Sequence, residues 1–272
     1  MSGNIRMMPR LGIAGLRSGF ILAVLLMLAA SGCVNYGGTR SGGAVSKESR
    51  LAAHLKMGAA YLEVGDYNSA LSELSKAELL EPNNVEVNSY LGLTYYGKAE
   101  YALAIERYKK VLQLDPRKTD IHNNLGLIYL RLKDYAQART EFETCIKEPT
   151  YAQVHLAQFN LGLLEESEGH PDKAEAIYRQ VINSNQMPSA YFRLGQLAIN
   201  RQDYRAAVDY LMPAVRIDAK YTDAYFALAE SYEALGMKDE AAEAYGQVVV
   251  LSPNTSRAIE SQSRVRRLLG FQ

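Results

Sequence analysis

From Leu51 onward, apolar residues recur every three or four positions, in stretches separated by polar or glycine-bearing breaks. This spacing is typical of amphipathic helices that bury one face. Leu125, Gly126 and Tyr129 share a face on one stretch, and Ala138 and Phe142 share a face on the next. The pattern therefore predicts an all-α chain built of successive helix pairs.

The pairs repeat, and glycine marks their period. Glycines stand at positions 58, 92, 126, 162 and 195, with Ala229 sixth, at intervals of 34, 34, 36, 33 and 34 residues. Glycine inside a helix costs about 1 kcal/mol relative to alanine, so we expect these positions to allow a close helix crossing. On the second stretch of each pair a small residue recurs, and a bulky one follows four positions later. The small residues are Ala70, Ala104, Ala138, Ala174, Ala207 and Ala241, and the bulky ones are Leu74, Tyr108, Phe142, Tyr178, Leu211 and Tyr245.

This period and pattern resemble the tetratricopeptide repeat (TPR), a helix-turn-helix unit. The resemblance covers about residues 51–255 and implies a right-handed superhelical solenoid of six repeats within 47–255. Aspartates in three breaks, Asp66, Asp134 and Asp203, are predicted to cap second helices. A last amphipathic helix over 256–272 is expected to cap the open end. The expected repeats are 51–84, 85–118, 119–154, 155–187, 188–221 and 222–255.

The N-terminal segment reads as an export signal over residues 1–32. Its apolar run from Phe20 to Ala30 is shorter than the roughly 20 residues that a membrane-spanning helix needs, and arginines but no acids precede it. Small residues directly precede Cys33. This arrangement resembles the lipobox of bacterial lipoproteins, in which the cysteine is acylated. An ordinary secretory signal before a free cysteine and an uncleaved amphipathic anchor are the alternatives.

Residues 33–46 would then be the lipidated cysteine and a flexible linker rich in glycine and serine. In lipoproteins of diderm bacteria, most residues other than aspartate after the cysteine direct the protein to the outer membrane, and here that residue is Val34. The expected location is the outer membrane, with the body in the periplasm.

Composition narrows the classes of function. Without residues 1–33 the chain carries 27 basic against 30 acidic residues, so it lacks the positive charge that nucleic-acid binding requires. If Cys33 is acylated, only Cys145 remains, which excludes an intramolecular disulfide. Cys145 stands at a small-residue position of the third repeat, so we expect a buried, inert thiol, with a disulfide to a partner as the alternative.

The chain shows no hydrolase elbow, phosphate loop, zinc-protease motif or paired-cysteine metal motif, so we predict no enzyme, no metal and no cofactor besides the lipid. His54 and His122 occupy a position that usually packs a bulky side chain, and packing is the expected role. His155 and His170 are expected in solvent. The carboxylates are interpreted as a solvated surface, although Glu165 stands where the repeat usually has tyrosine.

A stacked TPR array makes a groove lined by first helices, and the resemblance implies that this groove binds a segment of another protein. Because most of its residues are apolar, an amphipathic helix or strand is the expected ligand, with structural fill as the alternative. The predicted groove residues are Leu93, Tyr96, Asn123, Leu127, Leu130, Phe159, Leu163, Phe192, Gln196 and Ile199.

Signal, lipobox, short linker and six repeats together resemble the type IV pilus biogenesis lipoproteins of the PilF, PilW and Tgl type. The third repeat is two residues longer than the standard 34, with Tyr151 before an alanine-rich entry into the next helix, as in that family. The resemblance implies a pilotin that helps the pilus secretin reach and multimerise in the outer membrane. An adaptor for peptidoglycan enzymes, proteases or polysaccharide export, and a purely structural scaffold, are the alternatives.

Overall fold

The computed structural model describes residues 46–270, which contain thirteen α-helices and no strand. The first twelve helices form six consecutive pairs, and a thirteenth follows them. In chain order they are α1 (Lys47–Glu63), α2 (Tyr67–Leu80), α3 (Val85–Gly97), α4 (Tyr101–Leu114), α5 (Thr119–Arg131), α6 (Tyr135–Lys147), α7 (Val154–Ser167), α8 (Pro171–Ser184), α9 (Pro188–Asn200), α10 (Tyr204–Ile217), α11 (Thr222–Ala234), α12 (Lys238–Leu251) and α13 (Ser256–Leu269). The all-α prediction is confirmed.

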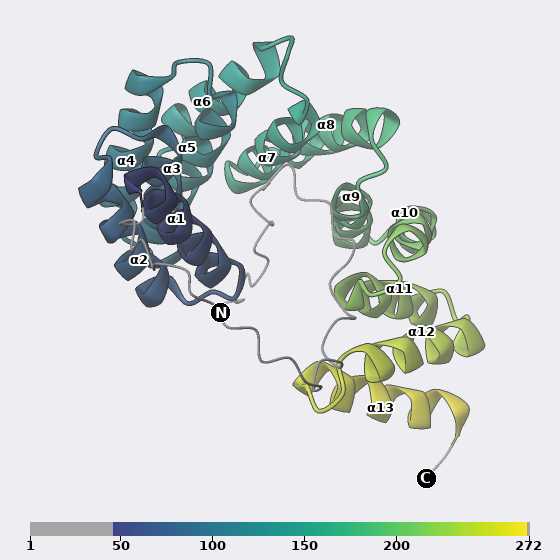
Figure 1. The fold of residues 1–272 in the computed structure, drawn as a ribbon. Helices are drawn as coiled ribbons and strands as arrows, with labels where there is room; N and C mark the ends of the chain where they lie inside the picture. The colour runs from purple at the N-terminus through teal and green to yellow at the C-terminus, as the bar shows by residue number, and fades with distance from the viewer. Residues whose placement is uncertain (1–45, 271–272) are drawn as a thin grey trace, which may run out of the picture. The chain divides into compact units, whose positions relative to one another are not determined.

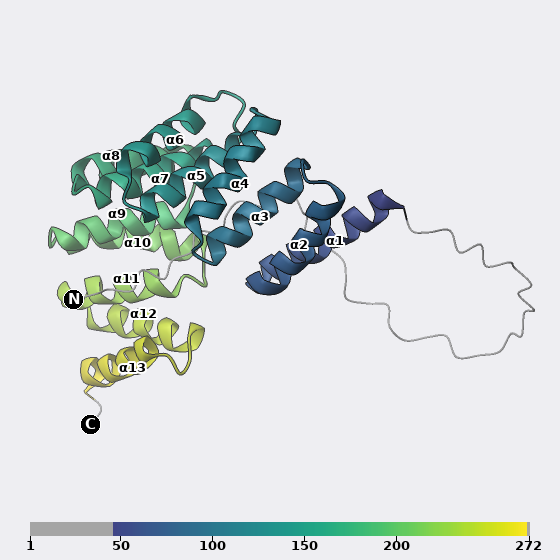
Figure 2. The same ribbon diagram turned by 90° about the vertical axis from the view of Figure 1, so that its left-hand side faces the viewer.

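The chain divides into two compact units between Tyr90 and Leu91, within α3. In the first unit, α1 packs against α2. In the second unit, α5–α6, α7–α8, α9–α10 and α11–α12 pack as pairs, each pair contacts the next, and α13 packs on α12 (Figures 1 and 2). First helices also contact one another, α5 with α7 and α9 with α11, so they line one side of the stack.

The packing glycines explain how two helices of a pair come so close. At Gly92, a β-carbon would lie 2.5 Å from Cε1 of Tyr108, on the second helix of the same pair. At Gly58 it would lie 2.7 Å from Leu74 Cγ. The predicted close crossing is therefore confirmed: the bulky residue of the second helix rests on the glycine of the first.

The small residues that face the crossing are fully buried in all six pairs, and the bulky residues that follow them are at most 1% exposed. They form the continuous core of each pair. This agrees with the predicted pattern, in which the second helix of each pair has an alanine and, four positions later, a bulky side chain.

The breaks between the helices of a pair share one conformation. Each contains a residue with positive φ immediately before the N-cap residue of the second helix, and this residue is glycine at Gly65, Gly169 and Gly236. Asp66, Asp134 and Asp203 follow and accept hydrogen bonds from backbone N–H groups of the first turn, at 3.1, 3.2 and 3.0 Å. The three predicted caps are confirmed.

Candidate protein-binding surface

The predicted groove residues all lie on first helices, α3, α5, α7 and α9, but their exposure differs. Four are buried, at 5–8% exposure: Asn123, Leu127, Phe159 and Phe192. The other six are half-buried: Leu93, Tyr96, Leu130, Leu163, Gln196 and Ile199.

The buried members hold the pairs together. The Phe159 ring lies 5.5 Å from that of Tyr178, and the Phe192 ring lies 5.1 Å from that of Tyr221. Asn123 Oδ1 accepts a 2.9 Å hydrogen bond from Asn160 Nδ2, which joins α5 to α7 inside the protein. These side chains are part of the core, so a charged substitution at Phe159 or Phe192 would test folding before it tested binding.

The half-buried members leave a smaller apolar surface. Leu163 packs against the core cluster around Tyr178, Tyr96 lies beside Tyr101 with ring centroids 6.0 Å apart, and Gln196 accepts a 3.2 Å hydrogen bond from Arg193. Three half-buried apolar side chains remain, one on each of α3, α5 and α9. We call these three, Leu93, Leu130 and Ile199, the first-helix face.

An ion pair that the sequence reasoning missed joins two first helices. Arg193 on α9 lies 3.7 Å from Glu166 on α7, and both side chains are about one quarter exposed. Glu166 also accepts a hydrogen bond from the hydroxyl of Tyr178, at 2.5 Å. The two residues are 27 positions apart, so no local pattern in the sequence could have indicated the pair.

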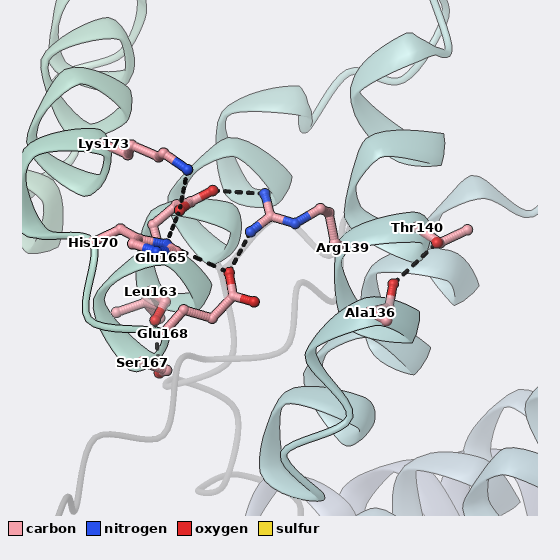
Figure 3. A network of polar contacts seen from close by, with 9 residues as sticks. All are labelled: Ala136, Arg139, Thr140, Leu163, Glu165, Ser167, Glu168, His170 and Lys173. Atoms are coloured by element: carbon pink, nitrogen blue, oxygen red, sulfur yellow. Dashed lines mark hydrogen bonds and ion pairs between the residues drawn. The ribbon is translucent and has the colours of Figure 1, made fainter.

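A denser polar network surrounds Glu165, whose side chain is only 4% exposed (Figure 3). Arg139 on α6 reaches across to α7, where its Nη1 donates to Glu165 at 2.6 Å and its Nη2 donates to Glu168. His170 Nδ1 lies 3.0 Å from the second oxygen of Glu165, and Lys173 approaches it at 4.0 Å. The prediction that carboxylates lie on a solvated surface is wrong at Glu165, which is buried. His170 is exposed, as predicted, with 45% of its side chain accessible, and it is also a partner of that carboxylate.

The buried carboxylate of Glu165 is stabilised in its charged form by its cationic partners. Burial raises the pKa of Glu165, but the hydrogen bond and charge of Arg139, with the hydrogen bond of His170 and the charge of Lys173, together outweigh burial. The pKa therefore lies below its ordinary value of 4.5. Ligand atoms of Glu165, Glu168 and His170 lie within 4.8 Å of one another, as in a metal site. However, the guanidinium of Arg139 already binds both carboxylates. The arrangement is that of an ion-pair network that joins α6 to α7.

Two further histidines make the same contact in two repeats. His54 Nδ1 lies 2.7 Å from Glu73, and His122 Nδ1 lies 2.6 Å from Glu141; in each case the glutamate is on the second helix of the same pair. Both histidine side chains are 24% exposed. Packing alone was the predicted role, and the structure corrects it: each histidine also binds a carboxylate.

Cys145 is fully buried and free, as the sequence predicted for the thiol. Burial raises its pKa to about 12, and its Sγ donates to the carbonyl of Thr119 at 3.3 Å. Cys33 and the rest of residues 1–45, with the predicted signal, lipidation site and linker, lie outside the described residues. Within 46–270, none of the helices combines the length and the apolar character needed to cross a bilayer.

Comparison with known protein families identifies the repeat. Family models described as TPR repeat or tetratricopeptide repeat match residues 99–133, 119–148, 159–221 and 223–255. No curated protein sequence gives a significant match.

Solved structures share the fold at low identity. PilF of Pseudomonas aeruginosa is 22% identical with a TM-score of 0.64, over 80% of this chain and 98% of that one. PilW, described as a widely conserved type IV pilus biogenesis factor, is 21% identical with a TM-score of 0.66, over 78% of this chain and 98% of that one. Yeast Tom70 is 16% identical with a TM-score of 0.66, over 82% of this chain and 47% of that one.

The matches over 119–148 and 159–221 fall on the pairs α5–α6, α7–α8 and α9–α10, each of which has a packing glycine against a bulky partner. The chain is therefore a tetratricopeptide-repeat protein, and such proteins are protein-interaction scaffolds.

Proposed function

We propose that the chain is an outer-membrane lipoprotein whose TPR body acts as a pilotin for the secretin of a type IV pilus. The observation that carries the proposal is similarity over 98% of the lengths of both PilF and PilW, in a chain that also has a lipobox-like segment ending at Cys33. Tom70 has an equal TM-score to PilW, but the similarity spans less than half of its length. Fold alone therefore does not select the function, and the match in length together with the lipobox-like segment favours the pilus proteins.

The mechanism is capture. Acyl chains on Cys33 hold the body at the periplasmic side of the outer membrane, and no other cofactor and no catalysis are required. A bound secretin segment then stays near the membrane, where its effective concentration rises and favours multimerisation.

The first-helix face suits such a segment. Leu93, Leu130 and Ile199 present apolar surface, and the Glu166–Arg193 pair offers one charge of each sign on α7 and α9. An amphipathic helix or strand binds by apolar contact and takes its orientation from neighbouring charges.

The direct test is binding of the full-length, detergent-solubilised protein to the purified secretin of the same organism. We expect Leu130→Lys to weaken this binding by about tenfold or more, because it places a charge in an apolar contact. Leu103→Lys is the matched control, since Leu103 lies on the second helix α4 and is 41% exposed. Circular dichroism spectra identical to the unsubstituted protein are required of both variants.

Three results would contradict parts of this proposal. Equal loss of binding in both variants would exclude the first-helix face as the contact. Absence of secretin binding, with capture of a peptidoglycan enzyme, protease or polysaccharide export protein from the envelope, would support the adaptor instead. Absence of any specific client would support a structural scaffold.

The anchor has its own test in cell fractions. We expect Cys33→Ser to release the protein from the membrane and Val34→Asp to move it to the inner membrane, because the first removes the acylated thiol and the second changes the sorting residue. Unchanged outer-membrane retention of Cys33→Ser would overturn the lipoprotein assignment without affecting the TPR fold.

A further inference from the structure

A cavity of about 140 Å³ lies where α8, α9 and α10 meet. Its lining combines apolar side chains with charged ones. The lining residues are Glu175, Arg179, Leu194, Ala198, Arg201, Asp203, Ala206 and Tyr210.

The repeat pattern explains why space remains there. Three positions after the packing glycine, or after its counterpart Ala229, four of the six repeats have tyrosine. The fourth repeat has Glu165 and the fifth has Ala198. The tyrosines of this set are Tyr61, Tyr95, Tyr129 and Tyr232. Ala198 thus stands where a repeat of this chain usually places an aromatic ring.

The sixth repeat shows where that ring goes. Tyr232 reaches back to the second helix of the preceding pair, where its hydroxyl donates to Met212 Sδ at 3.3 Å. Met212 directly follows the bulky residue Leu211 on α10. Arg179 occupies the equivalent position on α8, because it directly follows the bulky residue Tyr178. A ring on residue 198 would therefore extend toward Arg179, which lines the cavity.

The lining fits a flat apolar group with a polar edge. Leu194 and Ala198 are buried, at 1% and 6% exposure, and the Tyr210 ring is a neighbour. The charged groups already have partners: Arg179 binds Glu175 at 2.6 Å and donates to the Tyr210 hydroxyl at 3.1 Å, and Arg201 also binds Glu175. Guanidinium groups held in this way remain able to contact an aromatic face.

The size agrees with one ring, since an engineered apolar cavity of about 150 Å³ binds benzene. We propose that this cavity receives an aromatic side chain, a tyrosine, from the bound secretin segment, so that the partner supplies the ring that Ala198 lacks. The identity of the partner rests on the proposed function, whereas the specificity of the cavity for a phenol ring does not.

The cavity is tested first with p-cresol, which is the tyrosine side chain with its Cβ as a methyl group. We expect saturable shifts of the Leu194 and Ala198 methyl resonances in the full-length protein, and no shift of the Leu194 resonances in Ala198→Tyr, which fills the space with the residue of the sister repeats. Ala198→Leu is a smaller filler that serves if the tyrosine variant does not fold. Tyr232→Ala is the positive control and should gain a second p-cresol site beside Met212. Absence of saturable shifts in the unsubstituted protein, or equal binding by a folded filler variant, overturns the proposal.

The second arm measures secretin binding. We expect a folded filler variant to bind the secretin at least about tenfold more weakly, as loss of a buried aromatic anchor predicts. Unchanged affinity would overturn the assignment of the ring to the secretin. If the unsubstituted protein does not bind the secretin at all, the proposed function fails, and p-cresol still decides whether the cavity recognises a phenol ring.

Discussion

At the scale of single residues, the fold depends on complementary sizes at a few repeated positions. A glycine on the first helix and a bulky side chain on the second occupy one shared volume, as Gly92 and Tyr108 do. Local helix propensity opposes this choice, since glycine is among the poorest helix formers. Packing therefore outweighs propensity at these positions.

Gly92→Ala should destabilise the protein by about 1–3 kcal/mol, because the added methyl group overlaps the Tyr108 ring. Gly246→Ala is the matched control: Gly246 lies inside α12, and a β-carbon added there would meet open space, so this change should stabilise by up to about 1 kcal/mol. Urea unfolding monitored by circular dichroism measures both. Equal effects in the two variants would show that helix propensity, and not the crossing, governs the packing glycines.

The buried thiol leads to a second prediction at this scale. With a pKa of about 12, Cys145 has roughly one part in ten thousand as thiolate at pH 8, and burial also blocks access. In a Cys33→Ser variant, Ellman's reagent should detect no thiol in the native protein and one after unfolding in urea. Rapid reaction of the native protein would mean that α6 opens locally.

At the scale of elements, ion pairs join successive helix pairs in the middle of the chain. Arg139 on α6 binds Glu168, the residue that directly follows α7. Glu175 on α8 binds Arg201, the residue that directly follows α9. The two pairs use equivalent positions of their repeats with opposite polarity. Each helix pair therefore has charges that complement only the pair that follows it. If a pair stacked on the wrong neighbour, like charges would come together.

Glu165 makes one of these junctions sensitive to pH. Its lowered pKa means that it stabilises the fold above its ordinary pKa of 4.5, and that this contribution is lost as pH falls through the lower folded-state pKa. Arg139→Leu would remove the hydrogen bond and the charge of Arg139, which lower the pKa of Glu165, so this pKa would rise. We expect a loss of about 3 kcal/mol at pH 7 that shrinks as pH falls toward 5, because protonation removes the buried charge that has lost its arginine.

Urea unfolding at several pH values tests this. Lys147→Leu serves as the control, because Lys147 pairs with Glu143 at 3.1 Å on the surface and is 75% exposed. It should cost less than about 0.5 kcal/mol, with little change between pH 7 and pH 5. A penalty for Arg139→Leu that does not depend on pH would mean that the arginine acts through its packing rather than its charge.

At the scale of the whole molecule, α13 determines how the array ends. Ala258 and Ser261 are buried against α12, and Arg257 lies 4.9 Å from the Phe226 ring centroid. Arg264 donates to Glu233 at 3.1 Å. The helix thus covers the last pair with one face and presents polar groups on the other, as terminal elements of repeat proteins do.

Removal of residues 256–272 should lower the melting temperature by about 5 °C or more and promote association, because the apolar side of α12 becomes exposed. Ile259→Lys, on the outer face of α13 at 65% exposure, should leave the melting temperature unchanged. Thermal unfolding and light scattering measure both. If the truncated chain melts as the intact one does, α13 contributes little to stability.

For the predicted groove, the sequence indicated which helices carry the residues but not which of their side chains are exposed. The TPR resemblance placed the ten residues on first helices, where the structure has them, because the order of the helices along the chain follows from the spacing of apolar residues. It could not separate the buried Phe159 and Phe192 from the half-buried Leu130 and Ile199, since exposure depends on how the next pair packs. The role of Glu165 was missed for the same reason: its partner Arg139 lies 26 residues away.

By itself, the sequence determined the helix pairs, their period, the packing glycines, the aspartate caps and the buried Cys145, because each of these follows from contacts within one helix or one pair. Only the tertiary structure decided which apolar side chains remain partly exposed, which carboxylates are buried in ion pairs, and that Ala198 leaves a cavity. Those features arise between successive pairs, where the relevant residues are far apart along the chain. Contacts of that kind follow from how the pairs pack and have no periodic signature of their own.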